Sequence, residues 1–165
     1  MIDIFFEKVS ILLPAAMERM VGYSDAELNQ IEKLYDISIR GDFRKFMSRA
    51  GRSDGGVIGD DPLICYRPTW TVRGQILFQV NFFSSLQEIG AWDYLSKPFV
   101  FSWENESQYY FLQTSLPESD SVFMFDENQL TVVNTGMSFC DYLVETLDRY
   151  PIGRPICQGE LLTVC

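Results

Sequence analysis

The stretch "VFMFDENQLTVVNTGMSFCDYL", residues 122–143, decides the fold that this sequence predicts. Residues 122–125 and 130–133 are rich in apolar and β-branched side chains, and the polar run "DENQ" between them is typical of a hairpin turn. The bend at Asn134 and Thr135 leads into a segment whose apolar residues recur at helical spacing after Ser138, a favourable N-cap. We therefore expect a hairpin followed directly by a helix.

A second hairpin precedes this unit, and the first fifty residues are helical in pattern. "FVFSW" (99–103) and "QYYFLQ" (108–113) alternate around the turn "ENES". Residues 2–20 carry an apolar helical stripe that Pro14 interrupts. Ser24 and Glu27 form a capping box for the next helix, and Asp42 is the expected cap of a third one over residues 42–50. The sequence predicts an α+β fold, with N-terminal helices packed on an antiparallel sheet of hairpins and closed by a C-terminal helix.

The middle of the chain is less regular. "SDGGVIGDDP" (53–62) has the composition of an exposed loop, and "LICYR" (63–67) predicts a short strand. Residues 72–83 fit either a helix or a buried strand, because Gly74 weakens the helical interpretation. "SSLQEI" (84–89) predicts a single capped turn, and residues 151–165 an irregular tail.

Composition excludes several classes of protein. The chain has 165 residues, of which 47% are hydrophobic, so a single domain over 1–165 with a substantial core is expected. The net charge of -10 argues against a nucleic-acid binder. The four cysteines are widely spaced, which predicts a reducing cytoplasm. The N-terminus lacks signal-peptide character, and no run of 18 apolar residues predicts a membrane span.

Residues that support catalysis are scarce. The chain has no histidine, the commonest general base and metal ligand. "GGVIGDD" lacks the lysine and hydroxyl of a phosphate-binding loop, and nothing near Asp60 and Asp61 supplies a third metal ligand. No GxSxG motif is present. We expect no enzyme activity, no metal and no cofactor.

The charge of the chain is concentrated in one segment. Residues 98–148 hold nine acidic residues and no basic one, whereas residues 1–97 hold 11 bases and 13 acids. The hairpin turns carry Glu104, Glu106, Asp126 and Glu127, and aromatic residues alternate beside them. The functional interpretation is a docking surface for a basic protein, with these four acids as contacts and Trp103 or Tyr109 as anchors. The alternative is a solvated sheet rim whose aromatic residues belong to the core.

A smaller group of charges has the opposite sign. Arg40, Arg44, Lys45, Arg49 and Arg52 surround the third predicted helix. Its apolar residues Phe43, Phe46 and Met47 fall mostly on the other side. The interpretation is a solvated helix face, and the alternative, nucleic-acid binding through this face, is disfavoured by the overall negative charge.

The order of these segments resembles the SUKH superfamily, a large set of bacterial immunity proteins with eukaryotic and viral relatives. The resemblance covers roughly residues 20–148. It rests on "YSDAELNQIEKLY", "FRKFMSRAGRSDGG", "SSLQEI" and the closing unit "VFMFDENQLTVVNTGMSFCDYLVETL", with Asn134, Thr135 and Phe139 at its bend and helix. Residues 60–83 and the tail after Tyr150 depart from the family pattern.

This resemblance implies a cytoplasmic immunity protein. Such a protein binds a toxin domain, delivered by a neighbouring cell or made by the cell itself, and neutralises it by stoichiometric occlusion. Many of these toxins are basic nucleases, so the acidic segment agrees with the implied role. The alternative is a non-catalytic regulatory or scaffold protein of the same fold that binds a different protein partner.

Overall fold

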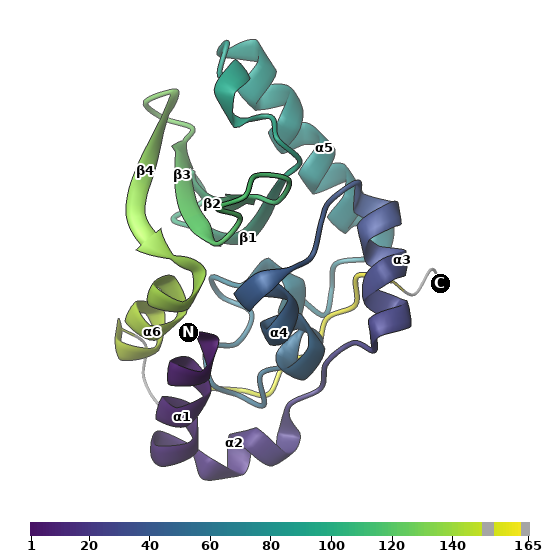
Figure 1. Ribbon diagram of the computed structural model, residues 1–165, viewed down its shortest axis with the longest axis vertical. Coiled ribbons are helices and arrows are strands. Elements are labelled where there is room, and N and C mark those ends of the chain that lie inside the picture. The colour runs from purple at the N-terminus through teal and green to yellow at the C-terminus, as the bar shows by residue number, and fades with distance from the viewer. Residues whose placement is uncertain (150–153, 163–165) are drawn as a thin grey trace.

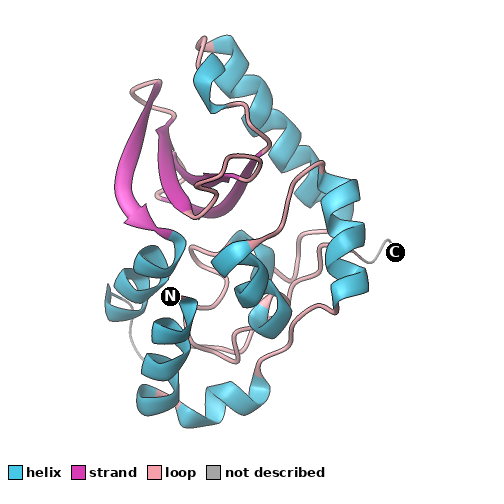
Figure 2. Ribbon diagram, in the orientation of Figure 1, coloured by secondary structure: helices cyan, strands magenta, loops and turns pink. Residues whose placement is uncertain are grey.

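The computed structural model describes residues 1–149 and 154–162, and it confirms the α+β fold (Figures 1 and 2). The helices within these residues are α1 (Ile2–Leu12), α2 (Pro14–Arg19), α3 (Asp25–Tyr35), α4 (Gly41–Ala50), α5 (Val72–Glu88) and α6 (Phe139–Arg149), with 3-10 turns η1 (Ile64–Tyr66) and η2 (Trp92–Tyr94). The strands β1 (Pro98–Glu104), β2 (Gln108–Gln113), β3 (Ser121–Asp126) and β4 (Thr131–Ser138) form one antiparallel sheet in the order β1-β2-β3-β4.

The N-terminal helices begin largely where the sequence predicts. Pro14 separates α1 from α2 and occupies the first turn of α2, where its missing N–H costs nothing. The capping box of α3 is confirmed, since the Ser24 hydroxyl accepts from the Glu27 amide at 3.2 Å while the Ser24 amide donates to Glu27 at 2.8 Å. The predicted Asp42 cap of α4 is wrong. Asp42 lies inside the first turn of α4, and the Asp120 carboxylate accepts from its amide at 3.4 Å.

The middle of the chain differs from the prediction in two places. Residues 72–88 form one helix, so "SSLQEI" is mostly the last turn of α5 and not a separate capped turn. Gly74 is tolerated because it lies in the first turn of α5, where its amide donates to the side chain of the N-cap Thr71 at 3.0 Å. "LICYR" contains η1 instead of a strand, and only Leu63 forms a bridge, to Ser102 in β1.

Two apolar cores lie on opposite faces of the sheet. On one face, Phe101 packs edge-on against Phe139 and Tyr142 of α6, within the larger core that also holds α1, α3 and α4. On the other face, Phe82 of α5 contacts Phe111 at a ring separation of 5.0 Å. The sheet is thus a middle layer, with α5 on one side and the remaining helices on the other (Figure 1).

The two edges of the sheet have different surroundings. The backbone of β1 is covered, because the Trp103 amide donates to the Pro62 carbonyl at 2.9 Å and the Gln79 side chain bonds to both the amide and the carbonyl of Val100. Strand β4 lies at the outer edge of the molecule (Figure 1), and within residues 1–149 and 154–162 no strand or loop pairs with its free side.

The tail is irregular in the part that the structure describes, as predicted, yet it contributes to the core. Leu161 is buried, and its carbonyl accepts from the Tyr35 hydroxyl at 2.8 Å. Arg52 joins Glu160 of the tail to Glu27 of α3, with both contacts at 2.9 Å. Residues 151–153 and 163–165 of the predicted tail lie outside the described residues. No helix in the described part is both long enough and apolar enough to cross a membrane.

Candidate protein-binding surface

Both hairpin turns lie at the same end of the sheet, which we call the hairpin end (residues 104–107 and 126–130). The β1–β2 turn contains two consecutive left-handed residues, with φ of 53° at Asn105 and 58° at Glu106, and the Ser107 amide donates to the Glu104 carbonyl at 3.3 Å. The second turn adjoins the first, because the Glu127 amide donates to the Ser107 carbonyl at 2.9 Å. The fold therefore brings together turn residues that are about twenty positions apart in the sequence.

Three of the four predicted acidic contacts gather at the hairpin end. Glu106 and Glu127 are exposed, and the Tyr109 hydroxyl donates to Glu127 at 3.2 Å. Asp126 is half-buried and accepts from the amides of Asn128 and Gln129, so its carboxylate shapes its own turn. Glu106 and Glu127 are thus the carboxylates most open to a partner.

Glu104 does not lie on the exposed rim where the sequence places it. Its side chain is 8% exposed, and the Arg149 guanidinium of α6 bonds to it at 3.1 Å. Glu104 ends β1 on the face that packs on α6, which turns its carboxylate inward. Its negative charge also contributes to raising the pKa of Tyr110 to about 12, although burial is the larger cause. Glu104 is therefore a structural ion-pair residue, unlike the other predicted contacts.

The two predicted aromatic anchors are only half exposed because they pack under α5. Phe78 of α5 contacts Trp103 at a ring separation of 5.6 Å and Tyr109 at 5.7 Å. Burial, followed by the nearby Glu127 carboxylate, raises the pKa of Tyr109 to about 12. Their ring faces therefore serve the smaller core, and only their outer parts are available to a partner.

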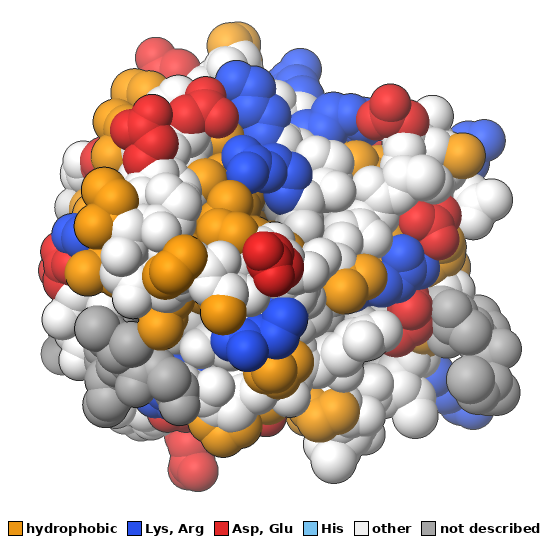
Figure 3. Space-filling view, turned by 90° about the horizontal axis from the view of Figure 1, so that it is seen from below, with side chains coloured by type: hydrophobic (Ala, Val, Ile, Leu, Met, Phe, Trp, Pro, Cys, Tyr) orange, Lys and Arg blue, Asp and Glu red, His pale blue; other side chains and the backbone are white. Residues whose placement is uncertain are grey.

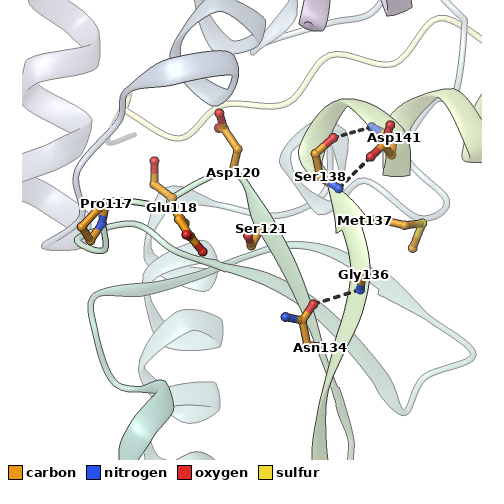
Figure 4. A pocket seen from close by; sticks show the side chains of 10 residues that line it. Pro117, Glu118, Asp120, Ser121, Asn134, Gly136, Met137, Ser138 and Asp141 are labelled. Atoms are coloured by element: carbon orange, nitrogen blue, oxygen red, sulfur yellow. Dashed lines mark hydrogen bonds between the residues drawn. The ribbon is translucent and has the colours of Figure 1, made fainter.

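A second acidic group lies at the opposite end of the sheet, around a hollow of about 380 Å³ (Figure 4). The loop before β3 contributes Glu118 and Asp120, and the first turn of α6 contributes Asp141. No Lys or Arg is among the residues that line the hollow. Burial raises the pKa of Asp120 above its usual value. The capping predicted for Ser138 is confirmed here, since its hydroxyl accepts from the Asp141 amide at 3.1 Å.

The outer face of α6 extends this second group. Asp141, Glu145 and Asp148 are exposed at steps of four and three residues, which places them on one side of the helix. Lys8 of α1 pairs with Asp148 at 2.6 Å. The acids of residues 98–148 thus form two groups at the two ends of the sheet, not a single rim, and the free edge of β4 runs between them.

Sequence reasoning missed the free edge of β4 because it ended the strand at Val133. The structure continues β4 to Ser138, with a register shift opposite Ser121 and Phe123. One signal was available: the sequence has no charged residue between Glu127 and Asp141. This uncharged run is longer than the four-residue strand predicted from the sequence, and it indicated that the strand continues beyond Val133.

The loop at residues 53–62 is mostly buried, so the prediction of an exposed turn is wrong. Asp54 is 1% exposed, and its carboxylate accepts four amide hydrogen bonds from consecutive residues, Gly56, Val57, Ile58 and Gly59, at 2.7–3.2 Å. This carboxylate organises the loop as a helix cap organises a first turn. Within the described residues, no group of three or more His, Cys, Asp or Glu is arranged to hold a metal ion.

The basic residues around α4 lie on the helical side of the molecule, and Arg40 reaches the connection between β2 and β3, where its guanidinium donates to the Leu116 carbonyl at 2.6 Å. Several are engaged with neighbouring groups, since Arg44 pairs with Asp25 at 3.0 Å and Arg49 lies 3.8 Å above the ring of Phe6. Figure 3 shows Lys and Arg side chains along the upper part of this surface and hydrophobic ones on its left. Ile4 and Ile11 of α1 are also exposed.

Comparison with known proteins found no matching family model, no similar curated protein and no similar solved structure. The resemblance to the SUKH superfamily therefore stays a prediction from the sequence.

Proposed function

We propose that this chain is a non-catalytic immunity protein that binds a basic toxin domain and neutralises it by stoichiometric occlusion. One observation carries the proposal: the sheet and α6 expose acidic side chains at both ends, and residues 98–148 contain nine acidic residues and no basic one, although Lys8 and Arg149 from outside this segment pair with Asp148 and Glu104. A protein surface of one charge sign attracts and orients a partner of the opposite sign. The resemblance to the SUKH superfamily supplies the identity of the partner as a toxin.

The free cysteines support a reducing compartment for this function. Within the described residues, Cys65, Cys140 and Cys157 are free thiols. Burial raises the pKa of the Cys140 thiol, which keeps it protonated and unreactive. We place the protein in the cytoplasm, where a toxin that enters the cell would meet it.

The binding mechanism assigns different roles to the exposed and the half-buried residues. Glu106 and Glu127 accelerate encounter, because exposed charges act mainly on the association rate. The outer parts of Trp103 and Tyr109 act on the dissociation rate, because aromatic anchors contribute through buried contact area. Neither role needs a chemical step.

The test is to co-express the chain with the product of its neighbouring gene, and to measure cell growth and complex formation. We expect a one-to-one complex and rescue from toxicity. The double reversal Glu106→Lys/Glu127→Lys should slow association at least about threefold at low salt, with less effect at high salt. Glu18→Lys/Glu88→Lys, which reverses two exposed glutamates in α2 and α5, is the matched control.

Two outcomes would overturn the proposal. If neither a complex nor rescue is observed with a toxic neighbour, neutralisation of that class of partner fails. If a complex forms without any effect on growth, the regulatory or scaffold alternative replaces it.

A further inference from the structure

The free edge of β4 has the features of a strand that pairs with another chain. It is eight residues long, and no strand or loop among the described residues covers its outer side. Unpaired backbone groups on such an edge template the addition of a further strand. The edge is also accessible, because Val133 is 44% exposed in the middle of the strand.

The usual protection of an edge strand is mostly absent from β4. Natural edges are blocked by charged side chains, by proline or by a bulge. Thr131–Ser138 contains no charged residue and no proline. A bulge is present at Gly136, where φ is 75°, and side chains satisfy its backbone: Asn134 accepts from the Gly136 amide and Thr135 from the Met137 amide. The regular stretch that pairs with β3, Thr131 to Asn134, therefore remains open to a new strand.

The acidic residues at the two ends of β4 determine which kind of strand can pair with its free edge. Glu127 lies beyond one end, and Glu118 and Asp141 flank the other around the hollow of Figure 4. A second copy of this chain, paired antiparallel along β4, would place the acids of one copy against those of the other. Like charges so placed disfavour association. A strand that carries lysine or arginine has the opposite preference, and its side chains reach both acidic groups.

We propose that β4 binds an extended, basic segment of the partner protein by strand addition, and that the acidic residues at the two ends of the strand hold its Lys and Arg side chains. This inference rests on the proposed function and adds the mode of binding. The backbone of β4 supplies affinity through main-chain hydrogen bonds, and the flanking carboxylates supply selectivity for positive charge.

The experiment uses the full chain and synthetic peptides of the same length as β4, eight residues. One peptide alternates Lys with Thr and Val, a second replaces Lys by Glu, and a third keeps the lysines but replaces the Thr and Val residues by proline, which removes amide donors. Amide hydrogen exchange followed by NMR reports which backbone groups become protected. We expect the basic peptide to slow exchange in β4 at least about threefold at low salt, and the other two to have no effect.

A pair of double variants separates edge pairing from general attraction. Thr131→Lys/Val133→Lys places positive charge on the exposed side chains of β4, whereas Leu77→Lys/Val80→Lys adds the same charge to exposed positions of α5. We expect only the β4 variant to lose the protection. Thermal melts establish that both variants are folded, and a β4 variant that fails to fold is replaced by the single change Val133→Lys.

The outcomes distinguish this proposal from the proposed function. If the basic peptide or the basic partner binds but β4 gains no protection, strand addition is wrong while the proposed function stands. If β4 is already protected in the free protein and the protection grows with protein concentration, a second copy occupies the edge. If the partner binds through β4 but does not affect growth, the immunity function fails and strand addition stands.

Discussion

The sheet has two edge strands, and the molecule treats them differently. The edge at β1 is covered by two parts of the chain. In the segment before η1, the Pro62 carbonyl accepts from the Trp103 amide and Leu63 forms a bridge to Ser102, and Gln79 of α5 bonds to both backbone groups of Val100. The edge at β4 has no such cover within the described residues, and its cross-strand partners all lie in β3.

The difference shows that covering an edge requires dedicated polar groups. Gln79 is buried in α5 beside Phe82, and its side-chain amide provides one donor and one acceptor, as a neighbouring strand would. Asp54 is equally dedicated, because it holds the loop that carries Pro62 and Leu63 to the edge of β1. Among the described residues, no side chain or loop from another element bonds to the outer backbone of β4 from Thr131 to Asn134, which is consistent with an edge kept free for binding.

The largest expected effect on stability comes from removing Asp54, which holds the loop that covers the edge of β1. Asp54→Ala removes the acceptor for four buried amides, so we expect the free energy of unfolding to fall by about 3 kcal/mol or more. Urea denaturation measures the loss, and the exchange rate of the Trp103 amide should rise with it. Asp61→Ala, at an exposed position of the same loop, is the control. Equal stability of the two variants would show that the loop is held by other contacts.

A smaller effect is expected from Gln79→Ala, which removes the strand-like partner of Val100. The change leaves one buried donor and one buried acceptor unsatisfied, and should cost about 2 kcal/mol. Exchange of the Val100 amide should become faster, while exchange in β4 stays the same. Gln87→Ala removes an exposed glutamine from the same helix and should change stability little. Faster exchange in β4 as well would mean that the two edges are coupled.

The roles of Asp54 and Gln79 could not be predicted from the sequence. The two hairpins with their turns and the capping box at Ser24 were predictable, because period, turn residues and caps are local signals. The last part of β4, after Val133, was not. Asp54 and Gln79 were not, because polar residues in a loop or between apolar helical positions normally indicate exposure. Their burial depends on backbone groups distant in the sequence. The inward turn of Glu104 toward Arg149 was hidden for the same reason.

Low pH should reduce the free energy of unfolding by protonating Glu27, which pairs with Arg52 next to the loop that covers β1. The Arg52 guanidinium, hydrogen-bonded to this carboxylate, lowers the pKa of Glu27 to about 2 from its ordinary 4.5, and Arg52 directly precedes the loop that covers β1. A lowered folded-state pKa stabilises above the unfolded value and loses that contribution as pH falls toward 2. The stability difference between wild type and Glu27→Gln should therefore be largest near neutral pH and shrink below pH 4.5.

Because the Glu27 side chain is one-third exposed, this effect should be smaller than that of Gln79→Ala. Urea denaturation at several pH values provides the measurement. Glu18→Gln in α2 is the control for loss of a carboxylate. A difference that stays constant from neutral pH to pH 3 would show that the ion pair with Arg52 does not control this side of the molecule.

The smallest effect is expected at β4 itself. Val133 is 44% exposed, and among the described residues its strand pairs with β3 alone, so Val133→Lys should change the free energy of unfolding by no more than about 0.5 kcal/mol. Val133→Ala, which also loses the β-branched side chain but adds no charge, should give the same result within error, because the added ammonium group extends into water. Chemical denaturation of both variants tests this. A loss as large as that for Gln79→Ala would mean that the edge of β4 is needed for folding, and the asymmetry between the two edges would then reflect stability instead of binding.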